Sequence, residues 1–251
     1  MDWVKAQSRH QLYLIDSAQS VKPADLPKRI LDELSAKARS EEGFFRLASQ
    51  MRIQGGSDYI DYVGRVLDGS QTLPETFGSY SVRFFDDVRA MRDAIFEKER
   101  EHSLCRMVAG FAWPWISKNS PDAHDIVLDG VGLTWNRTAS DWINSPTSVE
   151  EVGSIHTVQG YDLNYAGVII GADLGFDAVN QQIVFRRENY HDKKGKENNP
   201  RLGIVYTDDD LLEYVKNIYR VLLTRGIRGT FVYVVDPELR EHLRPFFSGT
   251  R

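Results

Sequence analysis

Short apolar runs alternate with amphipathic segments along this chain. The runs at 166–171 and 230–235 are apolar almost throughout and have the length of buried strands. Residues 207–222 instead carry apolar side chains at helical spacing behind an acidic first turn, which predicts a capped amphipathic helix. We expect Gly226 and Gly229 to end that helix.

The same reading predicts the other elements of the chain. Strands are predicted at 11–15, 44–48, 80–85, 104–109, 153–157 and 182–186, and helices at 27–39, 57–67, 86–101 and from Pro237 onward. Residues 111–150 are expected to be largely irregular, and 189–201 to form a polar surface loop. Strands that alternate with helices, several of them apolar on both sides, predict an α/β fold with a mostly parallel sheet and helices on both faces.

Composition narrows the class of protein. The 251 residues suffice for one large domain or two small ones, and 41 % apolar and 27 % charged residues are typical of a globular chain. The single cysteine, Cys105, cannot form an intramolecular disulfide, and no apolar segment approaches membrane-spanning length. We therefore predict a cytoplasmic protein with no membrane partner. A net charge of −5 argues against a broad nucleic-acid footprint but allows a local groove.

Polar residues follow apolar runs at four places, 16–19, 50–52, 156–162 and 224–226. Ligands of open parallel sheets bind outside the carboxyl ends of the strands, so these places are candidates for a binding site. Glutamine and arginine recur in them, and both suit a phosphate-rich ligand. Each residue alone has an ordinary structural explanation, such as a salt bridge for Arg225 or a hydrogen bond for His156.

In order along the chain, these segments resemble the motifs of superfamily 1 helicases. SIHTVQGYD (154–162) and YRVLLTRG (219–226) resemble motifs V and VI, LYLIDSAQSVKP (12–23) is similar to motif III, and QMRIQGG (50–56) to motif IV. The segments RMVAGFAWPW (106–115) and VGLTWN (131–136) point to a narrower group, the Schlafen group 3-like DNA/RNA helicase domain family. The resemblance covers residues 10–245 and is strongest from 151 to 245.

This resemblance implies a RecA-like fold and two domains. Residues 51–251 would be the second RecA-like domain of a superfamily 1 helicase, and residues 1–50 the tail of the first, around motif III. Such proteins bind ATP with Mg²⁺ between the two domains. Gln19 would sense the γ-phosphate, while Arg52 and Arg225 would act as arginine fingers on the transferred phosphoryl group.

The resemblance also assigns the remaining site residues. On the nucleotide side of the cleft it places Asp16, Gln159, Gly160 and Asp162, the last of these as the acid that reaches the ribose. Near the nucleic acid it places His156 and Thr157. No metal-ligating cluster is expected in this chain.

The sequence departs from the family pattern in several positions. Met51 stands where many members have an adenine-stacking tyrosine, Gly226 replaces the usual alanine, and Ser17 stands where a magnesium-binding acid would be needed. The P-loop pattern G-x-x-x-x-G-K-[ST] is absent. We therefore expect the C-terminal half of a longer NTPase, inactive alone, whose partners are a missing N-terminal RecA-like domain and single-stranded DNA or RNA.

Two other functions fit the same residues: a nucleic-acid- or protein-binding module that has lost catalysis, and an NTP-driven switch in a defence or signalling protein. The tryptophans of 113–142 would pack in the core or stack on bases. The basic residues of 186–196 would line a nucleic-acid path or form a solvated loop. No G-x-S-x-G motif occurs, which argues against a covalent hydrolase.

Overall fold

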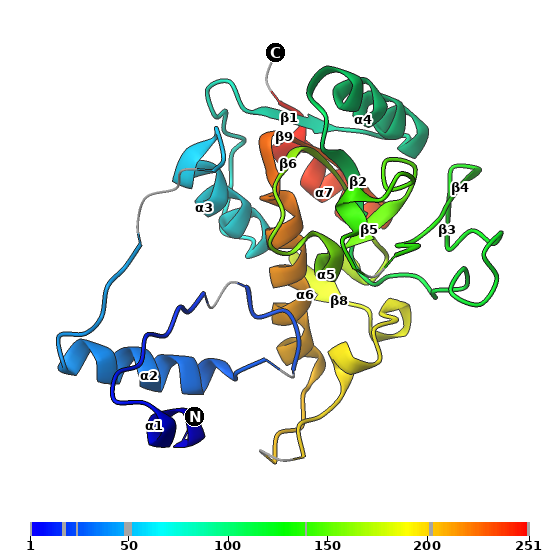
Figure 1. Ribbon diagram of the computed structural model, residues 1–251. Coiled ribbons are helices and arrows are strands. Elements are labelled where there is room, and N and C mark those ends of the chain that lie inside the picture. Colours follow the sequence, from blue (N-terminus) through cyan, green and yellow to red (C-terminus); the bar gives the residue numbers. More distant parts are fainter. Residues whose placement is uncertain are drawn as a thin grey trace.

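The computed structural model describes residues 2–16, 19–23, 25–47, 52–138, 140–200 and 203–249. Its main sheet contains five parallel strands (Figure 1), in the order β1 (Ser81–Phe84), β9 (Gly226–Val234), β6 (Leu163–Ile170), β2 (Cys105–Ala109) and β5 (Val152–Ser154). Two antiparallel hairpins accompany it, β3 (Ile126–Leu128) with β4 (Val131–Leu133) and β7 (Leu174–Asp177) with β8 (Gln182–Phe185). The α/β fold with a mostly parallel sheet is confirmed.

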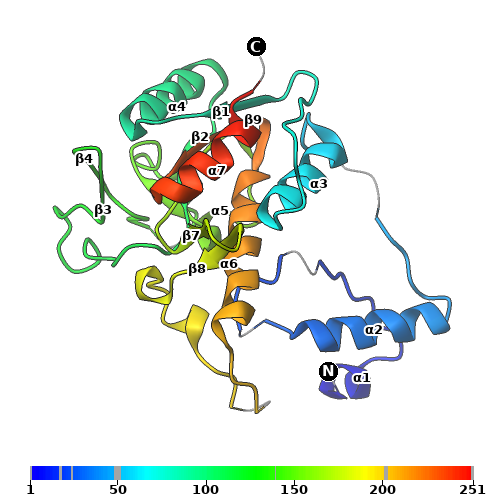
Figure 2. The ribbon, with the colours of Figure 1, turned by 180° about the vertical axis from the view of Figure 1, so that it is seen from behind.

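Helices cover both faces of this sheet, as predicted. One face packs against α3 (Gly56–Leu67), α6 (Asp208–Leu223) and α7 (Pro237–Phe247), and the other against α4 (Val88–His102) and the β3–β4 hairpin. Figure 2 views the molecule from the side on which α7 lies in front of the sheet. Burial from both sides is why the central strands read as continuous apolar runs.

The central strand β6 shows how the two cores are separated. Ala166, Val168 and Ile170 belong to the core beneath α3, α6 and α7. Tyr165 and Ile169 belong to the core beneath α4. Alternate side chains of a strand point to opposite faces, so one apolar run supplies both cores.

The predicted helix starts are confirmed for α6 and α7. Thr207 and Asp210 form a capping box, in which the Thr207 amide donates to Asp210 Oδ2 at 2.8 Å and the Asp210 amide to Thr207 Oγ1 at 3.2 Å. Asp236 caps α7, and Pro237 occupies its first turn. Helix capping therefore explains the acidic run at 208–210.

Two predicted strands are wrong. Residues 11–15 and 44–47 are extended coil beside α1 (Asp2–Gln7) and α2 (Lys28–Ser40), and their side chains are exposed; residue 48 lies outside the described residues. Leu12, Leu14, Phe45 and Leu47 are 85 %, 84 %, 84 % and 90 % exposed. In the described part of the chain no strand pairs with these segments, so most of their apolar side chains stay exposed.

Three further features differ from the sequence prediction. The strand expected at 153–157 ends at Ser154, after which α5 (Ile155–Val158) forms a single turn. The region 111–150 contains the β3–β4 hairpin. Gly226 does not lie in a helix-terminating loop, because α6 ends at Leu223 and β9 begins at Gly226 itself.

Gly226 has no room for a side chain. A Cβ there would collide with the carbonyl oxygen of Gly229 and lie 3.3 Å from the amide nitrogen of Ala166, both backbone atoms of the central sheet. Gly64, in α3, would place its Cβ at ordinary van der Waals distance from the Arg220 side chain, 3.6 Å away.

Replacing Gly226 with alanine is therefore expected to lower the free energy of unfolding by about 1–3 kcal/mol, because the β6–β9 pairing must shift. The matched change Gly64→Ala should be neutral or stabilise by roughly 0.5–1 kcal/mol, since alanine is the better helix former. Urea unfolding of both variants measures the difference. Equal stabilities for Gly226→Ala and the wild type would contradict the packing described.

Asp173 is a fully buried carboxyl group just beyond β6. Its Oδ1 accepts a hydrogen bond from the Tyr219 hydroxyl at 2.6 Å, whereas Oδ2 has no partner among the described residues. Burial raises the pKa of Asp173 to about 7, against a usual value of 3.8. The neutral acid is therefore favoured in the folded protein.

Because the pKa of Asp173 is raised on folding, its contribution to stability is complete below pH 3.8 and is lost as pH rises through about 7. Asp173→Asn should therefore become more stable relative to the wild type as pH rises from about 5 to about 8. Urea unfolding at pH intervals of about half a unit measures the difference. Asp177→Asn, at an exposed carboxyl whose pKa is lowered by Asn180, should not show this gain. A pH-independent difference for Asp173→Asn would refute the assignment.

Candidate functional site

Arg225 lies between the end of α6 and the start of β9 and is only 3 % exposed. Its Nη1 donates to the carbonyl oxygen of Tyr161 at 3.3 Å. Its Nε is buried and has no hydrogen-bond acceptor in the described part of the chain. A buried donor without an acceptor is uncommon in folded proteins and indicates a position that a ligand atom can fill.

Arg52 reaches the same place from the segment before α3. Its Nε lies 3.3 Å from Asp162 Oδ1, and its Nη2 donates to the carbonyl oxygen of Thr224 at 3.5 Å. The segment itself is held to the sheet, because the Gln54 amide donates to the carbonyl oxygen of Ile227 at 2.9 Å. Arg52, Asp162 and Arg225 thus form one group of charges, the arginine cluster.

Buried hydroxyl groups hold the end of α6 and thereby position Arg225. The Tyr59 hydroxyl and Thr230 Oγ1 both donate to the carbonyl oxygen of Leu223, at 3.0 and 2.9 Å. The Tyr80 hydroxyl donates to the carbonyl oxygen of Gly226 at 3.1 Å. Free carbonyls at a helix end need such partners. Sequence reasoning missed both tyrosines, whose aromatic character indicated only core packing.

The arginine cluster carries an excess of positive charge. Burial, followed by the nearby charge of Arg52, lowers the pKa of Arg225 to about 10, while Asp162 acts in the opposite direction. Arg225 remains charged at neutral pH. Two guanidinium groups with one half-exposed carboxylate leave a net positive site, which attracts an anion with several oxygen acceptors.

The cluster lies at the amino ends of β6 and β9, not at the carboxyl ends that the sequence argument expected. Asp162 and Arg225 directly precede the paired residues Leu163 and Gly226. The reason is the connection 155–162, which leaves the carboxyl end of β5 and runs back to the start of β6. Gly160, with φ of +93°, allows the chain to turn within this connection.

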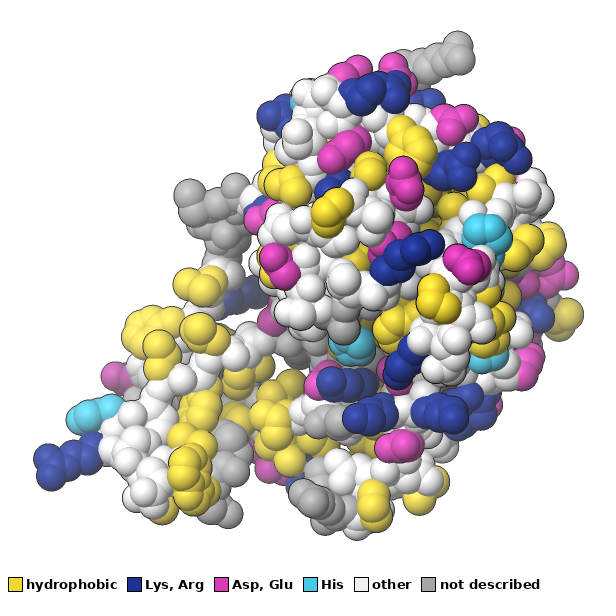
Figure 3. Space-filling view, turned by 45° about the vertical axis from the view of Figure 1, so that its right-hand side comes forward, with side chains coloured by type: hydrophobic (Ala, Val, Ile, Leu, Met, Phe, Trp, Pro, Cys, Tyr) yellow, Lys and Arg dark blue, Asp and Glu magenta, His cyan; other side chains and the backbone are white. Residues whose placement is uncertain are grey.

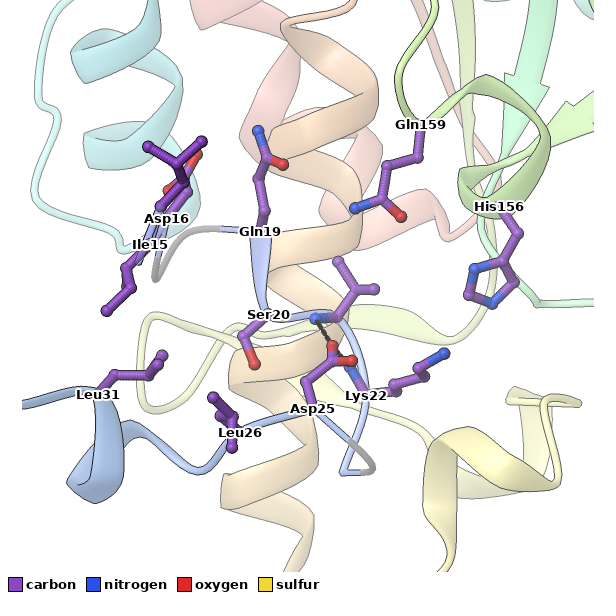
Figure 4. A pocket seen from close by; sticks show the side chains of 12 residues that line it. Ile15, Asp16, Gln19, Ser20, Lys22, Asp25, Leu26, Leu31, His156 and Gln159 are labelled. Carbon is purple, nitrogen blue, oxygen red and sulfur yellow. Dashed lines mark hydrogen bonds between the residues drawn. The ribbon is translucent and has the colours of Figure 1, made fainter. Parts of the chain in front are cut away.

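The predicted residues Asp16, Gln19, His156 and Gln159 line a separate cavity of about 260 Å³ (Figure 4). Lys22 and Asp25 complete its polar wall. Apolar side chains close the other parts of it, namely Leu14, Ile15, Val21, Leu26 and Leu31. In Figure 4, Gln159 and His156 face the segment that carries Gln19 across the cavity. The segment that carries Gln19 and the α5 region, which lie far apart in the sequence, therefore line one pocket.

The segment that carries Gln19 is anchored on α6. Asn217 Nδ2 donates to the carbonyl oxygen of Ser20 at 3.0 Å, and the Tyr206 hydroxyl donates to that of Pro23 at 3.2 Å. Val21 is buried in the core beneath α6. Asp25 Oδ2 accepts from the Val21 and Lys22 amides at 2.9 and 3.2 Å, which closes the turn drawn with dashed lines in Figure 4.

The two residues predicted near nucleic acid differ in their surroundings. His156 is exposed, and its ring lies 5.5 Å from that of Phe111. Desolvation by neighbouring groups, followed by the charge of Lys22, lowers the pKa of His156, which favours the neutral ring. Thr157 is buried, and its hydroxyl donates to Asn136 Oδ1 at 2.8 Å, which gives it a structural role in the α5 turn.

Basic and aromatic side chains lie near His156. Figure 3 shows lysine and arginine side chains gathered around two histidines in the lower part of one face. Lys22 lies near His156, and Lys196 near His191, since each lysine lowers the pKa of that histidine. Among the tryptophans, Trp135 and Trp142 are buried in the core, whereas Trp115 is exposed.

Some predicted features lie outside the described residues. These are Gln50 and Met51 of the motif IV segment and Ser17 of the motif III segment. Among the described residues, no group of three or more His, Cys, Asp or Glu side chains is arranged to hold a metal ion. Within the same ranges, no helix is both long enough and apolar enough to cross a bilayer.

Comparison with known proteins identifies the family to which the chain belongs. No solved structure matches it. An uncharacterized protein of Saccharomyces cerevisiae is 34 % identical over 211 residues, which make up 79 % of this chain and 46 % of the yeast protein. The chain thus spans about half the length of that relative. The family model of the Schlafen group 3 DNA/RNA helicase domain matches residues 1–236, and the chain belongs to this family.

Proposed function

We propose that the arginine cluster is the phosphate-binding part of an ATP site, and that this chain is the second RecA-like half of a helicase-like NTPase. The observation that carries the proposal is the buried Arg225 Nε, which has no acceptor among the described residues and lies beside the second guanidinium group of Arg52. Membership of a helicase-domain family supports ATP as the anion.

The residues present fit a polyphosphate. Arginine offers a planar set of donors that matches phosphate oxygens, and two such groups lie at the cluster. When bound, ATP supplies a phosphoryl group on which negative charge develops during transfer. Arg52 and Arg225 would stabilise that charge, a role worth about 10³-fold or more in rate. Among the described residues no group of three or more His, Cys, Asp or Glu side chains could hold a metal ion, so Mg²⁺ would be held largely by the phosphates themselves.

Helix α6 would connect the two parts of the proposed site. Asn217, near its middle, holds the segment of Gln19, and Arg225 follows its end. A shift of Gln19 on contact with the γ-phosphate would therefore act on the same rigid helix that positions Arg225. Gln159, Gly160 and Asp16 would line the nucleotide side of the cleft between them.

The first RecA-like domain of the pair would complete the site. This sequence contains no P-loop, so the lysine that holds the β- and γ-phosphates must come from another domain. The exposed apolar residues of the N-terminal arm, among them Leu12, Leu14 and Phe45, would pack against that domain. Residues 1–50 would then be its tail, as the resemblance implies.

Single-stranded DNA or RNA is the second ligand that we propose. His156 and Phe111 supply flat rings, and Lys22 and Lys196 supply positive charge beside the two histidines. This patch adjoins the Gln19 cavity, so nucleic acid and nucleotide would contact neighbouring residues. Binding that weakens steeply with salt would support the patch.

Arg225→Gln is expected to weaken binding of inorganic tripolyphosphate at least about tenfold, a loss of roughly 1.4 kcal/mol, because one charged donor group is removed. The backbone carbonyl of residue 225 still accepts from the Leu163 amide in this variant, so the fold should persist. Isothermal titration measures the affinity. The control is Arg228→Ala, at an exposed arginine that is the third residue of β9. Equal affinity for Arg225→Gln and the wild type would refute the phosphate site.

The isolated chain should show no ATPase activity above background, because no P-loop lysine is present to hold the β- and γ-phosphates. Release of inorganic phosphate from ATP with Mg²⁺ measures this. Turnover by the wild-type chain that disappears in Arg225→Gln would overturn the proposal that a second domain is required.

A further inference from the structure

Asp162 occupies a distinctive position in the arginine cluster. Its Oδ1 faces Arg52 Nε at 3.3 Å, and its charge opposes the repulsion that Arg52 exerts on Arg225. The side chains of Arg52 and Asp162 are 31 % and 48 % exposed, so an ion from solvent can reach this pair. Arg225, in contrast, is buried.

The backbone around Asp162 is held by other contacts. The Leu163 amide donates to the carbonyl oxygen of Arg225 at 3.2 Å, and the Tyr161 amide to that of Val158 at 3.1 Å. Leu163 is fully buried in the core beneath α6. Removal of the Asp162 carboxylate would therefore change the charge of the site more than its shape.

We infer that Asp162 is an internal counter-ion that holds Arg52 until a polyphosphate replaces it. This inference rests on the proposed function. A phosphate oxygen that binds Arg52 Nε takes the place of the Asp162 carboxylate, and exposed ion pairs are weak enough to be exchanged. The same anion must also reach the buried donor of Arg225.

Asp162 weakens anion binding at the site in a way that depends on the charge of the anion. Its carboxylate repels a chain of phosphates, which carries more negative charge, more strongly than it repels orthophosphate. A chain of phosphates can in turn contact both guanidinium groups at once, so it can displace the carboxylate from Arg52 and still reach Arg225. Asp162 therefore lowers the affinity of the site for both anions, and for tripolyphosphate more than for orthophosphate.

The test compares affinities for orthophosphate and tripolyphosphate by isothermal titration at low salt. Asp162→Asn should bind both anions more tightly, roughly 3- to 10-fold for tripolyphosphate and less for orthophosphate, so that the preference for tripolyphosphate rises. Asp162→Glu keeps the charge and should behave like the wild type. Asp68→Asn is the matched control, since Asp68 pairs with Arg220 at 3.1 Å at another exposed site.

The outcomes separate this inference from the proposed function. If Arg225→Gln loses tripolyphosphate binding but Asp162→Asn binds it no more tightly than the wild type, the phosphate site stands and the counter-ion role is refuted. If neither the wild type nor any variant binds tripolyphosphate, both the proposed function and this inference fail. If Asp162→Asn does not fold, Asp162→Ala, which also removes the charge, takes its place: tighter binding of tripolyphosphate than by the wild type supports the inference, and equal affinity overturns it.

Discussion

The candidate site depends on how the carboxyl end of α6 is held in the core. Two buried hydroxyl groups, from Tyr59 and Thr230, bind the carbonyl oxygen of Leu223, and the pairing of β9 with β6 begins immediately afterwards. Arg225 lies between these two constraints and has little freedom to move. The absence of space for a Cβ at Gly226 belongs to the same constraint, because the strand must approach Gly229 and Ala166 closely.

A guanidinium group held in this way has an electrostatic consequence. It is buried, it lies near a second arginine, and one of its donors has no acceptor within the part of the chain that the structure describes. Folding has therefore concentrated positive charge where solvent compensates it poorly, and Asp162 reduces that charge only in part. Such an arrangement is favourable when an anion completes it, which is the physical basis on which we propose phosphate binding at this part of a helicase-family domain.

Much of the fold could be predicted from periodicity and capping. The helix after Thr207 and the strands around Val168 and Val232 follow from patterns within a few residues of each position. The same rules were wrong at 11–15 and 44–47, whose apolar residues resemble strands. A strand requires a neighbouring strand as partner, and in the described part of the chain none pairs with these segments.

The sequence by itself determined the α/β class, the helix starts and the family resemblance, because these depend on local spacing and motif order. Only the tertiary structure decided that Arg52, Asp162 and Arg225 share one cluster at the amino ends of β6 and β9, while Gln19 and Gln159 line a neighbouring cavity. It also decided that Asp162 faces an arginine. These contacts join segments far apart in the chain, and they arise from packing α3, α5 and α6 around one sheet, which no local pattern encodes.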